Sequence, residues 1–294
     1  MTQFLQATVY GLLEGGLLAL VAVGFSLVWG VMNVVNLAHG AFVVVGAYIA
    51  WKLNEAAGLD PYLGMFVAAA GLFVAGYVIQ WVLINQVVNA PIWMTLLLTF
   101  GLELLIMNGL ILIFSADFRA IDTGWASDSL ALGDVQVPYG RLAGFGLAVV
   151  LTVGLVLFMD RTKIGLAIRA TGMDRAAARL MGMNVRHVYA FTFGLAAAMA
   201  GMAGAMIGTI KTFSPAAAPL FTLQSFVIAV LGGLGNMWGA LAGGLLLGLV
   251  QSWGGQYLSG TLVNAIAFGV LVLVLIVKPS GLIGKPYYEA RAEA

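Results

Sequence analysis

Residues 160–188 read DRTKIGLAIRATGMDRAAARLMGMNVRHV, a basic segment in a chain that otherwise carries little charge. The segment holds six of the thirteen lysines and arginines of the sequence, namely Arg161, Lys163, Arg169, Arg175, Arg179 and Arg186. Lysine and arginine beside membrane-spanning segments stay preferentially on the cytoplasmic side. If the chain spans a membrane, this segment therefore lies in the cytoplasm and sets the orientation of the whole protein.

The second half of the segment predicts a short helix of its own. Asp174 suits the N-cap position, the alanine-rich stretch after it favours a helix, and Gly182 suits the position after the helix end. Leu180 and Met181 give this helix an apolar tip that fits a groove on a partner protein. We therefore interpret residues 174–182 as a docking element, formed by Asp174, Arg175, Ala176, Ala177, Ala178, Arg179, Leu180, Met181 and Gly182.

The composition indicates a membrane protein. Of 294 residues, 62% are hydrophobic and 9% are charged, whereas about a quarter are charged in a soluble domain. A net charge of +1 gives no reason to expect a nucleic-acid partner, and membrane lipid must cover the apolar surface. The first cation is Lys52, so the N-terminus lacks the basic region of a cleaved signal peptide, and we expect the first apolar stretch to be retained.

Apolar segments of spanning length, about 17–25 residues, or shorter ones bounded by glycine and asparagine, divide the chain. They fall at 8–28, 39–52, 62–84, 92–115, 140–159, 189–211, 219–232, 239–252 and 261–277. The segments at 39–52, 219–232 and 239–252 are short and predict broken or re-entrant helices, which occur only beside protein or a water-filled cavity. The expected fold is a single all-α polytopic membrane domain over residues 1–294, with eight or nine membrane segments.

Charges outside this basic segment indicate on which side of the membrane other parts of the chain lie. Residues 116–140 carry four aspartates against one arginine and are expected outside, while the C-terminal tail, with Lys278, Lys285 and Arg291, is expected inside. Nine crossings would place the N-terminus outside. Eight crossings with one re-entrant segment would leave the side of the N-terminus open.

Five polar residues inside apolar segments are candidates for a solute pathway: Glu14, Asn33, Asn36, His39 and Glu103. An ionisable side chain at membrane depth is costly, so its presence points to function. Asparagine and histidine in an interrupted helix can bind polar solute groups together with freed backbone groups. The structural alternative is that these groups satisfy one another, and that Glu14 lies near a helix end or faces another subunit.

Glycines at four-residue spacing predict close helix packing near the C-terminus. The residues are Gly235, Gly239 and Gly243 in one row, and Gly244 and Gly248 in the next. Such rows let another helix approach closely. Residues 28–50 and 230–252 both run from a Gly/Asn-rich interruption into a small-residue helix, which reflects either an internal duplication or shared composition alone.

Motifs of common enzyme classes are absent. The sequence has no GxxxxGK[ST], HExxH or GxSxG, no cysteine, and only two isolated histidines, so we expect no catalytic residues, no metal site and no cofactor. Any ATP hydrolysis would then take place in another subunit.

Three stretches together resemble the permease subunits of ABC importers of the branched-chain amino acid type (LivH/LivM-like). They are NVVNLAHGAFVVVGAY (33–48), GLAIRATGMDRAAARLMGMNV (165–185) and AVLGGLGNMWGALAGGLLLG (229–248) with the closing KPSGLIG (278–284). They occur in the family's order and span nearly the whole chain. ABC permeases generally carry an E-A-A-x-x-x-G pattern in the loop that seats in the ATPase, and here Ala176 stands where that pattern has glutamate.

The resemblance implies a multi-pass permease of the inner (plasma) membrane. It would work with a second permease subunit, a paralogue rather than a copy, two cytoplasmic ATPase subunits and an external solute-binding protein. Residues 160–188 would be the coupling loop, and the solute a branched-chain amino acid or a related small polar molecule such as urea or an amide. A self-sufficient secondary transporter or channel is the alternative, and a membrane enzyme has less support.

Overall fold

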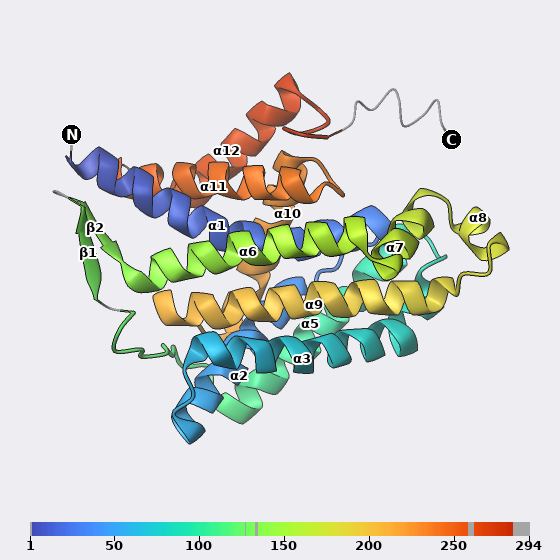
Figure 1. The fold of residues 1–294 in the computed structure, drawn as a ribbon, viewed down its shortest axis with the longest axis horizontal. Coiled ribbons are helices and arrows are strands. Elements are labelled where there is room, and N and C mark those ends of the chain that lie inside the picture. The colour runs from blue at the N-terminus through green and yellow to red at the C-terminus, as the bar shows by residue number, and fades with distance from the viewer. Residues whose placement is uncertain (1, 127, 133–134, 258–261, 285–294) are drawn as a thin grey trace.

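The computed structural model describes residues 2–126, 128–132, 135–257 and 262–284, and within these ranges the chain is a helical bundle with one small β-hairpin (Figure 1). The long helices are α1 (Thr2–Met32), α2 (His39–Ala57), α3 (Pro61–Ile79), α5 (Ile92–Phe114), α6 (Tyr139–Arg161), α9 (Val185–Ile210), α10 (Ala218–Gly232), α11 (Met237–Tyr257) and α12 (Leu262–Val277). The shorter elements are the π-helix η1 (Gln80–Ile84), α4 (Asn85–Val87), β1 (Ser129–Leu132), β2 (Val135–Pro138), α7 (Lys163–Met173), α8 (Arg175–Leu180) and the 3₁₀-helix η2 (Pro215–Ala217).

Each apolar segment of the sequence corresponds to one long helix, which confirms the all-α polytopic fold. Six helical stretches of the described chain are long and apolar enough to cross a membrane: 2–32, 61–87, 92–114, 139–161, 185–210 and 215–232. The chain is therefore a multi-pass membrane protein.

Helices α1 and α9 form the centre of the bundle. In each, 89% of the most apolar window is buried, against 17% in α5. Small residues make this burial possible, because a side chain at Gly46 of α2 would collide with the backbone of Gly201 in α9. Helices α3, α5 and α6 lie outside this centre and expose large apolar side chains, as a lipid-facing or subunit-facing surface requires.

The bundle has two distinct ends (Figure 1). The N-terminal end of α1 and the hairpin lie at one end, and α7 and α8 lie at the other. The hairpin pairs Ser129 with Pro138 and Leu132 with Val135, and its Gln136 exchanges two hydrogen bonds with Gln6 of α1. This separation is the one expected for nine membrane segments. The hairpin itself was not predicted from the sequence, and the tail beyond Gly284 lies outside the described residues.

Two helices begin within the bundle rather than at its ends. The His39 side chain, at the start of α2, bonds the carbonyl of Val21, which lies eleven residues, or about 17 Å, before the end of α1. The first residues of α10 pack against the same region, because a Cβ at Gly40 would meet the carbonyl of Ala218. Helices α2 (19 residues) and α10 (15 residues) thus start inside the bundle, which agrees with the expected interruptions at 39–52 and 219–232, and we call them half-helices because of these starts.

The third short segment is different. Residues 239–252 belong to α11, an uninterrupted helix of 21 residues, so the prediction of a break there was wrong. The glycines that suggested it are used for packing against neighbouring helices. The half-helix that faces α2 is α10, and not the 230–252 stretch that resembles residues 28–50 in composition.

Candidate functional site

The two half-helices meet N-terminus to N-terminus. The backbone N–H of Gly40 in α2 donates to the Thr222 hydroxyl of α10 over 2.9 Å, and the same hydroxyl donates to the carbonyl of Leu37 over 2.8 Å. We call this contact the half-helix junction, comprising residues 35–40 and 218–222. It places freed backbone groups and two helix N-termini, which carry partial positive charge, inside the bundle.

The unwound residues before α2 satisfy much of their own polarity. The Asn36 side chain accepts from the Ala38 N–H over 3.1 Å, and the His39 N–H donates to the Asn36 carbonyl over 3.3 Å. The fully buried His39 donates through Nε2 to the Val21 carbonyl over 2.8 Å, while its Nδ1 has no partner within the described residues. Asn33 is exposed in a left-handed conformation (φ 53°) at the end of α1, and so lies apart from the junction.

Glu103 reaches the junction from α5. One turn before it, the Thr99 hydroxyl accepts from the Leu37 N–H and donates to the carbonyl of residue 95, which holds α5 against the unwound segment. The Glu103 carboxyl lies beside the Thr222 hydroxyl, and the residue is 5% exposed. Its Oε1 has no hydrogen-bond partner in the described part of the chain. The junction thus contains a buried carboxyl group with a free acceptor oxygen beside Thr222.

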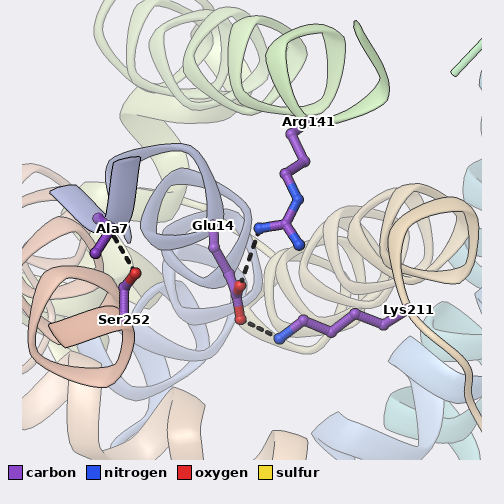
Figure 2. Close-up of polar contacts among 5 residues, drawn as sticks. All are labelled: Ala7, Glu14, Arg141, Lys211 and Ser252. Carbon is purple, nitrogen blue, oxygen red and sulfur yellow. Dashed lines mark hydrogen bonds and ion pairs between the residues drawn. The ribbon is translucent and has the colours of Figure 1, made fainter. Parts of the chain in front are cut away.

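Glu14 belongs to a different site. Its carboxylate pairs with Lys211, which follows α9, and its Oε2 lies 3.7 Å from Nη1 of Arg141 in α6 (Figure 2). The Arg141 guanidinium also lies over the Tyr10 ring, 4.4 Å from its centroid. This cluster ties α1, α6 and the end of α9 together on the side of the hairpin. Of the five polar candidates, Asn36, His39 and Glu103 thus lie at or beside the junction, while Asn33 and Glu14 do not.

The glycine rows contact two neighbours of α11. A side chain at Gly239 or Gly243 would collide with the backbone of α10, and one at Gly244 or Gly248 with the backbone of α1. Gly235 is not part of this helix. It lies in the turn before α11 with φ +82°, against Gly30 at the end of α1, because the helix begins only at Met237. Next to the Gly248 contact, the Ser252 hydroxyl donates to the Ala7 carbonyl (Figure 2).

The basic segment 160–188 forms the end of the molecule opposite the hairpin (Figure 1). The Asp174 side chain caps α8 by accepting from the N–H groups of Ala176 and Ala177 over 2.7 and 3.0 Å. Gly182 follows with φ +81°, as predicted for a helix end. Ala178 is buried, whereas Leu180 and Met181 are 88% and 79% exposed. Large apolar side chains exposed at this end, outside the spanning helices, suit contact with another protein.

The end of α3 connects the spanning helices to this segment. Here the helix changes to the π-helix η1, a distortion that often marks functional sites. Tyr77 bonds His187 at the start of α9 over 2.6 Å, and Asn89 accepts from Arg175 of α8 over 3.2 Å. Sequence reasoning missed these contacts. The only available signal was the polar run Gln80, Asn85, Gln86 and Asn89 at the end of an apolar segment.

Comparison with known proteins identifies the family to which this chain belongs. Residues 7–276 match the family described as "Branched-chain amino acid transport system / permease component". The chain is 31% identical to the permease protein BraD of Pseudomonas aeruginosa and 29% identical to LivH of Escherichia coli K12, in both cases over 97% of each chain. It is 26% identical to LivM of E. coli K12, over 90% of this chain and 67% of LivM. The chain is thus a multi-pass inner-membrane permease and not an enzyme, and it acts beside a second permease subunit. It belongs to the family of branched-chain amino acid transport permease components.

Proposed function

We propose that this permease carries branched-chain amino acids inward, as one half of the translocation path of an ATP-driven importer. The observation that supports this solute is the similarity, over nearly all of the chain, to proteins named for high-affinity branched-chain amino acid transport. The remaining partners of the proposed assembly are two cytoplasmic ATPase subunits and an external solute-binding protein. Residues 1–294 act in it as one permease domain.

The ATPase docks on residues 174–182, the tip of the coupling loop 160–188. The capped helix with exposed Leu180 and Met181 supports this role. Movement of α8 would pass to α3 through the Arg175–Asn89 contact and to α9 through the short turn after Gly182. The cations of the loop support a cytoplasmic position for it.

The solute passes close to the half-helix junction. The junction offers the solute backbone and side-chain groups of Asn36, His39, Thr222 and Glu103. Among these, the free Oε1 of Glu103 is the acceptor suited to the α-ammonium group of an amino acid. An ion pair with that ammonium would offset the cost of the carboxylate within the membrane. Asn33 lies at the cytoplasmic exit of this route, and Glu14 lies on its external side.

The test is uptake of radiolabelled leucine by vesicles that hold the complete importer, with ATP inside. Glu103→Gln keeps the shape of the side chain and removes its charge, so uptake should fall while the assembled complex remains. Glu55→Gln is the matched control, because within the described residues Glu55 pairs with the exposed Lys52 alone, at the end of α2. Wild-type leucine uptake by Glu103→Gln would contradict the pathway, and ATP-independent uptake by the wild type would contradict the importer.

A further inference from the structure

A pocket of about 480 Å³ lies where the basic segment 160–188 meets the spanning helices, at the α7–α8 end of the bundle (Figure 1). We call it the loop pocket. Its lining residues are Asn89, Arg179, Met183, Asn184, Val185 and Arg186. The volume falls within the range of about 300–1,000 Å³ that is typical of small-molecule sites. Solute passage and ATPase docking, as proposed above, do not account for this pocket.

Two arginines of the loop pocket have no acidic partner. Arg179 and Arg186 form no ion pair within the described residues, whereas Arg169 of the same segment pairs with Asp160. The acidic residue nearest to them in the sequence is Asp174, whose carboxylate caps α8 by accepting two backbone N–H groups. The pocket therefore has an excess of positive charge and suits an anion.

The loop pocket also offers unused hydrogen-bond donors. It includes the N-terminus of α9, a helix of 26 residues. The Asn184 side chain caps one N–H of this helix, while the N–H groups of Val185 and Arg186 have no acceptor in the described chain. The Oδ1 of Asn89 accepts from Arg175 over 3.2 Å, which leaves the amide nitrogen of Asn89 as a further donor. Free N–H groups at a helix N-terminus bind phosphate and other anions.

A buried hydroxyl beside the pocket lacks a partner as well. Tyr189 lies one turn after Val185 on the same face of α9, it is 2% exposed, and its hydroxyl has no hydrogen-bond partner within the described residues. The charged groups that act on this hydroxyl are Arg175 and Arg179, which are donors and cannot accept its proton. Burying an unpaired hydroxyl costs free energy. An oxyanion held by Arg179 would supply the missing acceptor.

Two tryptophans indicate that the loop pocket lies at the level of the lipid headgroups. Trp81 and Trp93 precede and follow Asn89 in the chain and are 40% and 57% exposed. The centroid of the Trp81 ring lies 4.4 Å from that of His187, the residue after Arg186. Exposed tryptophans of membrane proteins gather at the membrane–water interface. Helix α9 is about 39 Å long and the hydrocarbon core about 30 Å thick, so the first residues of α9 reach the headgroup region.

We propose that the loop pocket binds the phosphate group of an anionic phospholipid from the cytoplasmic leaflet. Basic pockets between membrane helices on that side bind anionic headgroups. A headgroup held by Arg179 of α8 and Arg186 of α9 would join the docking element to a central helix, so lipid composition would set how firmly α8 is held. The inference rests on the proposed function only for the cytoplasmic position of this end, and lipid binding in detergent is measured without it.

Native mass spectrometry of the complete importer in a non-ionic detergent tests the site, with the permease released from the complex together with its bound lipid. The importer is titrated with phosphatidylglycerol, or with zwitterionic phosphatidylcholine, and the wild-type permease should retain the first and not the second. Arg186→Gln and Arg179→Gln should each weaken phosphatidylglycerol binding about fivefold, the effect of one cation near an anionic lipid. Lys163→Gln is the matched control, because Lys163 is an exposed cation of the same segment outside the pocket lining, and it should bind like the wild type.

Three outcomes would overturn the proposal and leave the proposed function intact. Equal losses of binding in Arg186→Gln and Lys163→Gln would show that net charge, and not the pocket, attracts the lipid. Displacement of phosphatidylglycerol by inorganic phosphate, which then remains bound itself, would make the ligand a soluble anion. If the permease binds phosphatidylglycerol only after the ATPase subunits are removed, the ATPase covers the pocket, and an acidic surface of the ATPase is its occupant.

Discussion

Gly40 and Thr222, 182 positions apart in the sequence, are joined by a 2.9 Å hydrogen bond from the Gly40 backbone N–H to the Thr222 hydroxyl. This bond fixes the N-terminus of one half-helix against that of the other within the bundle. The bond requires the hydroxyl of Thr222, and a side chain at position 40 would collide with Thr222. The contact therefore makes the half-helix junction sensitive to single methyl groups.

Gly40→Ala should impair leucine uptake and destabilise the permease. The added methyl would lie 2.6 Å from both the backbone nitrogen and the hydroxyl oxygen of Thr222, and such overpacking costs about 1–3 kcal/mol. Thermal unfolding in detergent and vesicle uptake measure the two effects. Gly71→Ala on α3, where a Cβ meets nothing within 4 Å, is the control and should behave like the wild type. Equal stability of the two variants would show that the junction is looser than described.

Gly243→Leu should prevent α11 from packing against α10. A Cβ at Gly243 would already lie 2.7 Å from the carbonyl oxygen of Ile228, and leucine adds three more carbons to that contact. The variant should be recovered in low yield and with little uptake. Gly146→Leu on α6 is the matched control, because nothing lies within 4 Å of a Cβ there. Normal activity of a normally expressed Gly243→Leu protein would refute tight packing at this position.

Features of this fold that depend on neighbouring residues could be predicted from the sequence, whereas features that depend on residues distant in sequence could not. The nine segments and the Asp174 cap were predictable, because apolar length and capping are set by neighbouring residues. The ion partners of Glu14 were not, because Arg141 and Lys211 are distant in sequence and approach only in the folded bundle. Glycine richness was also ambiguous, since it marks a left-handed turn at Gly235 but helix packing at Gly243.

Glu14→Gln should lower stability modestly, and more at low salt than at high salt. The substitution removes the carboxylate shared by Arg141 and Lys211 and leaves two cations facing each other (Figure 2). Partly exposed ion pairs contribute about 0–1 kcal/mol each, and salt screens them. Thermal unfolding at two salt concentrations measures the effect, with Glu55→Gln as a control for the loss of a single exposed pair. A salt-independent loss of stability would point to packing rather than charge.

Thiol labelling should place the hairpin end outside and the α7–α8 end inside. Because the chain has no cysteine, Phe118→Cys and Met173→Cys each provide one reporter at an exposed position. An impermeant maleimide on intact cells should label position 118, and should label position 173 only after the membrane is opened. Labelling of Met173→Cys alone in intact cells would invert the topology and remove the cytoplasmic coupling role of residues 160–188.

The exposed tip of α8 should hold the ATPase. Leu180→Asp replaces a side chain that is 88% exposed, so it should leave the permease folded and inserted while it places a charge in the apolar contact. We expect the ATPase subunits to be lost on purification and ATP-driven leucine uptake to be abolished. Ala178→Trp should act differently, because Ala178 is buried and the indole ring in place of its methyl group would displace α8 itself.

Arg179→Glu is the control for charge on the same helix, and it should have a smaller effect, since exposed ion pairs contribute about 0–1 kcal/mol. The measurements are co-purification of the ATPase with the permease and leucine uptake by vesicles, at matched expression. If Leu180→Asp retains both the ATPase and full uptake, α8 does not carry the contact. If Arg179→Glu alone releases the ATPase, charge rather than the apolar tip holds the two subunits together.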